Sequence, residues 1–422
     1  MDRARAARRG ARCSSLGFQP LAGHAGAQHV GGRRHDHGCS LDGASVNAHA
    51  PARTLEPGLA AGAAADRVAP ALAAAAPQTP AERLVDAVIE DYFANRIARA
   101  DAIGDQAGLL WRRAADSARG GKRLRPRLVL LAYEALGGHD RAAAAVVAAA
   151  FEVLHSALLL HDDVLDGDLV RRGRPNLAGA FAASAVESGT EPVTATAWGA
   201  ASGLLAGDLL LSGVHALISR IDDPARARLT EIVDDAVFLT AAGEHADVGF
   251  ALGVMPAESG DIRRMMEHKT ATYSFAAPLR AGAVLAKAPP ATADALWRIG
   301  TGLGLLYQLR DDMLGVFGIE ELTGKSAMGD LREGKRTLLI AFAEREDAWR
   351  DVAHLFGLRS LAADDAERLR AAIIDSGAVA AVEALIAEQL AQVGQDIDDA
   401  GLPDLLRSGL RSIAGMCAER DA

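Results

Sequence analysis

The chain has 422 residues, of which half are apolar and only 4% are aromatic, and its net charge is −10. This acidic balance argues against nucleic acid as the main partner. Because Ala and Leu, both strong helix formers, dominate the apolar residues, the composition predicts an all-α fold.

The N-terminal residues 1–78 do not have the pattern of a folded domain. They are rich in Ala, Arg and Gly and show no sustained apolar period. We expect a disordered N-terminal extension, with an Arg-rich transit peptide as the alternative.

Folded sequence begins at Thr79. Thr79-Pro80-Ala81-Glu82 has the pattern of a capping box with Pro in the first turn. Apolar windows of helical period alternate from there with short Gly or Pro breaks, so residues 79–422 are predicted to form one helical domain. Residues 183–196 are the best candidate for a flexible loop.

Two wider features concern the compartment. The three cysteines, Cys13, Cys39 and Cys417, are far apart and form no disulfide or metal-ligand pattern. This indicates a reducing, cytoplasmic setting. No uninterrupted apolar run approaches the roughly 20 residues of a membrane helix. We therefore expect no transmembrane segment.

The first acidic cluster follows an apolar run in LLLHDDVLDGDLVRRGRP, residues 158–175. Asp162 and Asp166 are four residues apart and share one face of a helix, with Asp163 beside them. Such carboxylates are costly unless they are paired or bound to a cation, and hard oxygen ligands suit Mg²⁺. Mg²⁺ usually completes its shell with waters and substrate phosphates, so the cluster also predicts a phosphorylated ligand.

A second cluster occurs about 150 residues later in YQLRDDMLGVFG, where Asp311 and Asp312 again end an apolar helix. Two acidic clusters that face each other across a bundle are a recurrent way to build a metal site. The third carboxylate is absent here, because Gly315 stands four residues after Asp311.

Cations accompany both clusters. Only five residues are lysine, and Lys122, Lys269, Lys325 and Lys335 stand in GGKRLRP, HKTATY, LTGKSA and REGKRT. Glycines let a backbone approach a phosphate, and lysine offers it a compact charge. GGKRLRP lacks the frame of a nucleotide-binding P-loop, so nucleotide hydrolysis is not expected.

These motifs, in this order, resemble those of the trans-isoprenyl diphosphate synthases over residues 80–415, in particular actinobacterial geranylgeranyl diphosphate synthases. The resemblance implies a helical bundle with a central substrate cavity, a homodimer, and about three Mg²⁺ ions. It also implies the reaction, in which isopentenyl diphosphate is added to an allylic diphosphate.

The resemblance assigns roles to individual residues. It implies metal binding by Asp162, Asp163, Asp166, Asp311 and Asp312. Catalytic roles fall to Asp162, Asp163, Asp166, Arg171, Lys269 and Asp311. Isopentenyl diphosphate would be bound by Gly121, Lys122, Arg125, His155 and Arg172. The allylic diphosphate would be bound by Arg171, Lys269, Thr270, Gln308, Lys325 and Lys335. His161 is taken as structural.

Three departures from the family pattern concern the metal geometry. Gly315 replaces a third aspartate, Glu244 replaces a usual glutamine, and Ile319 and residues 328–330 differ from the common wording of the loop after the second cluster.

Product length is argued from the residues before Asp162. Ala157 and Leu158 occupy the places where an aromatic side chain would close the pocket early. We therefore expect a C20 product, geranylgeranyl diphosphate. The alternatives are a longer-chain polyprenyl diphosphate synthase, a class I terpene cyclase, and a catalytically weak subunit of a heteromeric synthase. GGKRLRP disfavours the cyclase, because a cyclase needs no isopentenyl diphosphate site.

Overall fold

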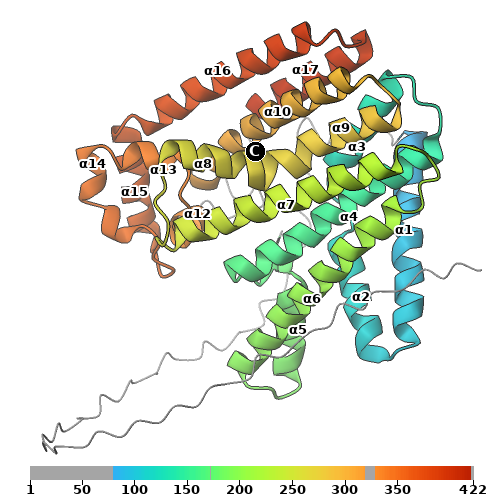
Figure 1. The fold of residues 1–422 in the computed structure, drawn as a ribbon. Coiled ribbons are helices and arrows are strands. Elements are labelled where there is room, and N and C mark those ends of the chain that lie inside the picture. Colours follow the sequence, from blue (N-terminus) through green and yellow to red (C-terminus); the bar gives the residue numbers. More distant parts are fainter. Residues whose placement is uncertain (1–78, 172, 319–327, 420–422) are drawn as a thin grey trace, which may run out of the picture. The chain divides into compact units, whose positions relative to one another are not determined.

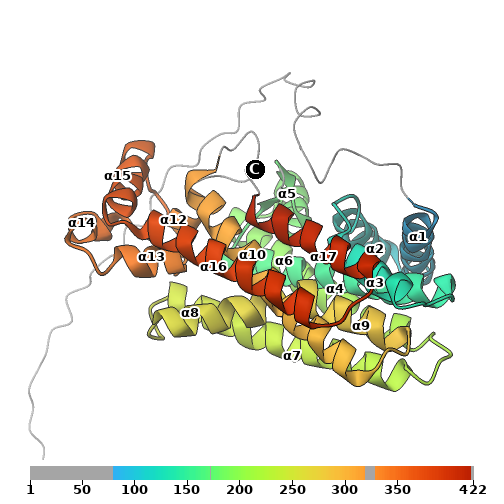
Figure 2. The same cartoon turned by 90° about the horizontal axis from the view of Figure 1, so that it is seen from above.

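The computed structural model describes residues 79–171, 173–318 and 328–419, which form a helical unit (Figures 1 and 2). The elements of the described residues are α1 (Pro80–Asp101), α2 (Asp105–Ser117), α3 (Leu124–Ala135), α4 (Arg141–Asp166), β1 (Val170–Arg171), β2 (Arg174–Pro175), α5 (Leu177–Glu187), α6 (Pro192–Ile218), α7 (Arg226–Ala251), α8 (Ser259–Met266), η1 (Glu267–Ala276), α9 (Ala277–Leu285), α10 (Pro290–Phe317), α12 (Gly329–Glu333), α13 (Leu338–Ala343), α14 (Asp347–Arg350), η2 (Ala353–Leu355), α15 (Ala363–Asp375), α16 (Ala378–Asp399) and α17 (Asp404–Ala418). The predicted all-α class is confirmed, and the strands β1 and β2 form one short antiparallel pair.

The start of the helical domain agrees with its sequence pattern. The Thr79 hydroxyl accepts a hydrogen bond from the Glu82 amide (3.1 Å), and the Glu82 carboxylate accepts one from the Thr79 amide (2.8 Å). This reciprocal pair is the predicted capping box. The predicted N-terminal extension, residues 1–78, lies outside the described residues.

The prediction of a loop at residues 183–196 is wrong for most of these residues. α5 continues to Glu187 and α6 begins at Pro192, so only residues 188–191 lie between helices. The side chain of Glu191 accepts a hydrogen bond from the Thr194 amide (3.2 Å), and Pro192 occupies the first turn. These capping features, added to the Ala-rich sequence, outweigh the Gly, Ser and Thr that suggested a loop.

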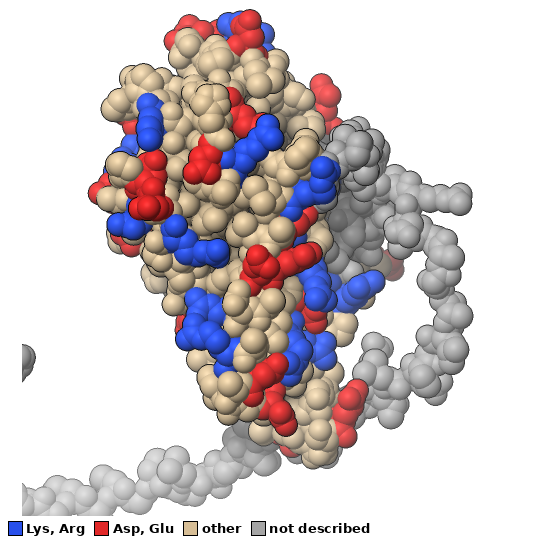
Figure 3. Space-filling view, turned by 90° about the vertical axis from the view of Figure 1, so that its right-hand side faces the viewer, with Lys and Arg blue, Asp and Glu red and all other residues tan. Residues whose placement is uncertain are grey.

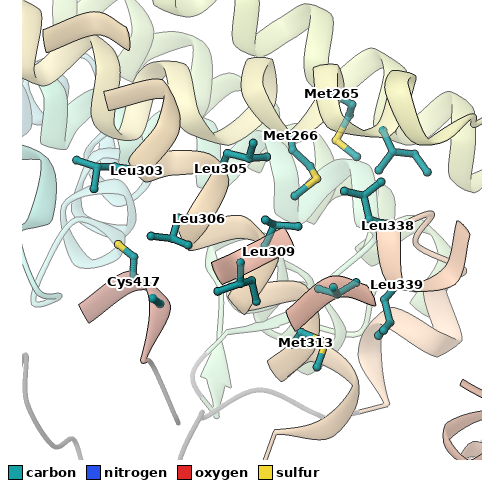
Figure 4. Packing of buried hydrophobic residues seen from close by; sticks show 14 of the residues in the cluster. Met265, Met266, Leu303, Leu305, Leu306, Leu309, Met313, Leu338, Leu339 and Cys417 are labelled. Carbon is teal, nitrogen blue, oxygen red and sulfur yellow. The ribbon is translucent and has the colours of Figure 1, made fainter. Parts of the chain in front are cut away.

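The apolar core follows two long helices. α4 packs against α1, α3 and α6 and is buried over most of its Ala- and Val-rich length. α10 is covered by Met265 and Met266 of α8, Leu338 and Leu339 of α13, and Cys417 of α17 (Figure 4). Each helix therefore runs through well-packed apolar surroundings before it reaches its acidic end.

Two described helices, α4 and α6, are long and apolar enough to cross a membrane by length and composition. Other helices bury most of the apolar window of α4 and half of that of α6. Burial of this kind is what a core helix requires, and the absence of a transmembrane segment stays a prediction.

A π-helix, η1, lies between α7 and α10. Its wider turn is visible where the Ala277 amide donates to the Thr272 carbonyl five residues earlier. Gly243 of α7 and Gly300 and Gly304 of α10 face its backbone, and a Cβ at any of them would lie within 3.0 Å of η1 backbone atoms. These glycines let the widened helix fit between its two neighbours.

We expect Gly300→Ala to destabilise the fold. Its Cβ would lie 2.5 Å from the Ala276 Cα and 2.7 Å from the Ala276 amide nitrogen, and neither backbone atom moves without shifting η1. Overpacking of this kind lowers the free energy of unfolding by about 1–3 kcal/mol. Urea denaturation measures it.

Gly394→Ala is the matched control for that measurement. Gly394 lies in α16 and a Cβ there would meet nothing within 4 Å. The change should be neutral or stabilise by up to about 1 kcal/mol, because Ala favours helix over Gly. Equal losses for both variants would contradict the packing argument.

Candidate active site

The first acidic cluster occupies the last two turns of α4. The helix ends at Gly167, which has a φ of 72°. Arg171 of β1 folds back onto the cluster: its Nε donates to Asp163 Oδ1 (2.7 Å) and its Nη2 lies 3.3 Å from Asp162 Oδ2. The predicted acidic face therefore exists and is partly neutralised by an arginine. Arg172 lies outside the described residues.

The second acidic cluster lies near the end of α10. Asp312 is buried, and its Oδ1 accepts a hydrogen bond from Gln308 Nε2 (2.7 Å). Gln308 Oε1 in turn accepts one from the Thr270 hydroxyl (2.8 Å). The structure thus brings Thr270 and Gln308 together beside the second cluster.

Lys269, which precedes Thr270 in η1, contacts the first cluster. Its Nζ lies 3.3 Å from Asp162 Oδ1, and 3.0 Å and 2.6 Å from carboxylate oxygens of Glu244 and Asp247 on α7. Two consecutive residues of η1 therefore connect α4 with α10, through Asp162 on one side and Gln308 on the other.

Lys335 approaches the first cluster from the segment after α12. Its Nζ lies 3.4 Å from Asp166 Oδ2, 2.9 Å from Glu333 Oε2 and 3.9 Å from Asp330 Oδ1. Lys325 lies outside the described residues. Lys287, which the sequence patterns left out of the site, is exposed and pairs with Asp223 elsewhere (3.2 Å).

Burial makes the acidic side chains of the site weaker acids. Desolvation raises the pKa of Asp163 to about 6, against the opposing effect of Arg171, and raises the pKa of Glu244 to about 7. It raises the pKa of Asp312 well above its usual value. Burial also acts on Asp162, but the charges of Lys269, Lys335 and Arg171 outweigh it and lower its pKa. For most of these carboxylates, the nearby positive charge is therefore too small to offset the cost of burying the ionised form.

Magnesium fits this donor set, although no three His, Cys, Asp or Glu side chains among the described residues are arranged to hold a metal by themselves. Mg²⁺ usually takes one or two protein carboxylates and completes its shell with waters and substrate phosphates. The hard carboxylate oxygens of α4 and α10, whose ionised forms burial disfavours, suit an ion that arrives with a diphosphate.

Two residues of the predicted isopentenyl diphosphate site meet around Tyr273. Arg125 Nη2 donates to Ser274 Oγ (2.7 Å) and to the Tyr273 hydroxyl (3.2 Å), which lies 3.4 Å from His155 Nδ1. The guanidinium carbon of Arg125 lies 4.9 Å from the centre of the Tyr273 ring. Arg125 Nε is buried and has no hydrogen-bond partner among the described residues, so it can donate to an anion.

The turn before α3 carries Gly121 and Lys122, which are exposed. Gly120 and Gly121 have φ values of 75° and 84°, a conformation that glycine adopts without strain. Arg123 points elsewhere, because its Nη1 donates to buried Glu152 (2.8 Å) and its Nε to Asp86 (3.2 Å). The first arginine of GGKRLRP, Arg123, therefore stabilises the packing of α1, α3 and α4.

The two chain-length candidates lie one turn before the first cluster. Ala157 is fully buried in the core around α4, and Leu158 is partly buried against it. His161 contacts α6, with its Nε2 3.3 Å from the Leu204 carbonyl oxygen and 3.3 Å from Asp208 Oδ1. This position agrees with a structural role.

Sequence reasoning missed the partners of these residues. Tyr273 and Ser274 follow Lys269 by four and five residues within HKTATYSF, so the π-helical turn was the missing information. Asp247, which follows Glu244 by three residues, was not singled out as a site residue, yet it makes the shortest contact to Lys269. Asp330, mentioned only as a departure, lies against Gly315.

We expect the stability of the metal-free protein to depend on Glu244. Because its pKa is about 7 in the folded state and near 4.5 otherwise, the folded state binds the extra proton between these values, and stability falls as pH rises through that window. Glu244→Gln removes this loss. The variant should match the wild type at pH 5 and be more stable by about 1–2 kcal/mol at pH 8.

Thermal unfolding in EDTA from pH 5 to 8 measures this difference. Glu231→Gln, which removes an exposed carboxylate from the same helix, controls for the loss of a charge. A Glu244→Gln variant that is less stable than the wild type at pH 8 would show that the contact with Lys269 outweighs the cost of burial.

Comparisons with known proteins agree with this geometry. Residues 111–373 match the family model described as polyprenyl synthetase. The chain is 33% identical over 316 residues to a (2E,6E)-farnesyl diphosphate synthase of Mycobacterium tuberculosis, covering 72% of this chain and 80% of the relative. It is 33% identical over 266 residues to a geranylfarnesyl diphosphate synthase of Aeropyrum pernix, covering 62% and 77%. Among solved structures, a geranylgeranyl pyrophosphate synthase of Corynebacterium glutamicum, complexed with isoprenyl diphosphate and magnesium, superposes with a TM-score of 0.75 at 27% identity, covering 81% and 98%.

Proposed function

Because the chain belongs to the polyprenyl synthetase family, whose members are prenyltransferases, we propose that it condenses isopentenyl diphosphate with an allylic diphosphate to give all-trans geranylgeranyl diphosphate. One observation supports this most directly: Lys269 and Thr270 of η1 connect the acidic ends of α4 and α10. A diphosphate bound between two such clusters has metal-binding carboxylates on both sides and lysine beside it.

The residues divide the reaction between two anion sites. We propose that the allylic diphosphate is bound by Lys269, Thr270 and Lys335, together with Arg171, Gln308 and Lys325. Isopentenyl diphosphate would be bound by Lys122 and Arg125, together with Gly121, His155 and Arg172. Tyr273 and Ser274 hold the guanidinium of Arg125 in place. Orienting two diphosphates in this way brings the reacting carbons together.

In the reaction, the bond between the allylic carbon and its diphosphate oxygen breaks, and the diphosphate leaves with the electron pair. The double bond of isopentenyl diphosphate then forms the new carbon–carbon bond, and a proton is lost to the departing diphosphate. Magnesium, when bound, supplies positive charge that stabilises the leaving group. The departure of the diphosphate leaves an allylic carbocation, and apolar residues of α4 before Asp162 exclude water from it.

The family is magnesium-dependent, and we propose three ions per active site. Asp162, Asp163 and Asp166 would bind them from α4, and Asp311 and Asp312 from α10. These carboxylates outnumber the lysine and arginine side chains that contact them, so the site can accept added positive charge.

The proposed reaction is tested by incubating the protein with Mg²⁺, labelled isopentenyl diphosphate and each allylic starter, and analysing the prenyl alcohols after phosphatase treatment. The wild type should elongate a starter. Asp162→Ala should lower turnover by at least about a thousandfold, because it removes the carboxylate that contacts both Lys269 and Arg171. Absence of any elongated product from the wild type would refute the proposal.

The C20 product length rests on Ala157 and Leu158. Neither is aromatic, and both lie one turn before the aspartates. The relatives carry names with three product lengths, farnesyl, geranylgeranyl and geranylfarnesyl. A longer-chain polyprenyl product is the alternative within the same chemistry. Gly315 is the feature that favours the other alternative, a catalytically weak subunit of a heteromeric synthase.

We expect Leu158→Phe to shorten the product. A ring one turn before the diphosphate site would block a growing chain, so the main product should change from C20 to C15. Leu159→Phe is the control, because the adjacent residue points about 100° away around the helix. Chromatography of the dephosphorylated products measures both, and an unchanged length in Leu158→Phe would remove this residue from the pocket.

We propose a homodimer that uses the exposed apolar side chains of α6. Trp198, Leu205 and Leu209 recur at helical spacing on one face and are 48%, 53% and 39% exposed. Phe238 of α7, the helix packed beside it, is 73% exposed. A second copy of this chain would bury them. Sedimentation velocity should give twice the chain mass, and Leu205→Asp should shift the protein towards monomer.

A cytoplasmic location is proposed from the cysteine pattern, and the side chain of Cys417 is buried. No nucleic-acid partner is proposed. On the face shown in Figure 3, basic and acidic side chains are intermixed rather than gathered by sign. Such a surface offers no extended basic area to a phosphate backbone.

A further inference from the structure

The second acidic cluster is one carboxylate shorter than the first. In the α4 cluster, Asp166 follows Asp162 by one helical turn, whereas Gly315 follows Asp311 at the same spacing on α10. Residues four apart share one face of a helix, so Gly315 leaves a gap next to Asp311 on that face.

Asp330 fills this gap from outside the helix. A Cβ built on Gly315 would overlap Oδ2 of Asp330 and would lie 2.8 Å from its Cγ and 3.5 Å from its Oδ1. The carboxylate of Asp330 therefore occupies the place where a side chain at position 315 would begin. Gly315 accommodates it because it has no side chain.

The position of Asp330 is built into the fold. It lies in α12, which packs against α10. The next residue, Leu331, is fully buried, and its carbonyl accepts a hydrogen bond from the Gly357 amide (2.9 Å). Arg332 donates through Nη2 to the Leu361 carbonyl (3.2 Å). Contacts on both following residues hold α12, and with it Asp330, against the end of α10.

The charges around Asp330 are those of the diphosphate site. Among the carboxylates that raise the pKa of Asp312, Asp330 has the largest effect, ahead of Asp311 and Asp247. Its Oδ1 lies 3.9 Å from Lys335 Nζ, which also contacts Asp166 of the first cluster. Asp330 therefore stands between the second cluster and a lysine of the first.

We propose that Asp330 supplies the carboxylate that the second acidic cluster lacks at Gly315 and so takes part in binding magnesium at the end of α10. This inference rests on the proposed function, since the ion arrives with the allylic diphosphate. Carboxylate oxygen is the ligand that Mg²⁺ prefers, either directly or through a coordinated water. On this reading Gly315 does not mark an inactive subunit, because the missing group comes from α12.

The test measures magnesium binding apart from turnover. Mg²⁺ is titrated calorimetrically into protein saturated with an allylic thiolodiphosphate, which keeps the diphosphate but does not react. Asp330→Asn retains the shape of the side chain and should weaken Mg²⁺ binding by about 10- to 100-fold, the range found when groups that support a metal site are lost. Asp330→Ala should do the same. Circular dichroism and thermal unfolding check that both variants fold.

A relocation variant distinguishes a carboxylate at this place from a structural role. Gly315→Asp combined with Asp330→Ala returns a carboxylate to α10 and removes the overlap. It should restore Mg²⁺ affinity to within about threefold of wild type, an effect that loss of α12 packing would not allow. Failure of the double variant, when folded, to regain affinity would overturn the inference.

Glu333→Gln is the matched control. It removes a carboxylate from the same short helix, and this one contacts Lys335 rather than Gly315. Mg²⁺ affinity should stay within about threefold of wild type, and a loss as large as that of Asp330→Asn would mean that the charge of α12, not the place of Asp330, matters. If the wild type binds the analogue with Mg²⁺ and elongates a starter but Asp330→Asn binds Mg²⁺ equally well, the inference fails and the proposed function stands. If the wild type does neither, both fail.

Discussion

The ammonium group of Lys269 has carboxylates from two other helices around it, and the rest of the site depends on this contact. A buried lysine without partners would lose its charge, and the ionised carboxylates of Asp162, Glu244 and Asp247 would cost more to bury without it. The mutual need fixes η1 against α4 and α7. It also holds negative and positive groups at contact distance.

Packing makes this electrostatic arrangement possible. The π-helical turn of η1 needs more room than an α-helix, and Gly243 and Gly300 provide it on opposite sides. α10 is held in turn by Arg310, which lies directly before the aspartates. Its two terminal nitrogens donate to Glu383 of α16 (2.8 and 3.1 Å), and its Nε donates to the carbonyl of Ala418 at the end of α17 (2.8 Å). The C-terminal helices therefore support the second acidic cluster.

The two acidic clusters differ in how they are built. Asp162, Asp163 and Asp166 come from consecutive turns of one helix, and Arg171 returns along the chain to meet them. The cluster on α10 combines Asp311 and Asp312 with Asp330, which another helix contributes. The carboxylate that the sequence lacks at Gly315 is thus supplied by Asp330, which lies fifteen positions later in the chain.

The sequence by itself determined the helical class, the helix start at Thr79 and the positions of both acidic clusters along their helices. These features depend on local composition and on spacing along one helix, which a sequence displays directly. The start of α6 was not predicted, since Glu191 and Pro192 begin a helix where small polar residues suggested a loop. Only the tertiary structure decided which groups meet: Lys269 with Asp247, Tyr273 with Arg125, and Asp330 with Gly315. The physical reason is that these contacts join residues of different helices, and their distances depend on how the helices pack.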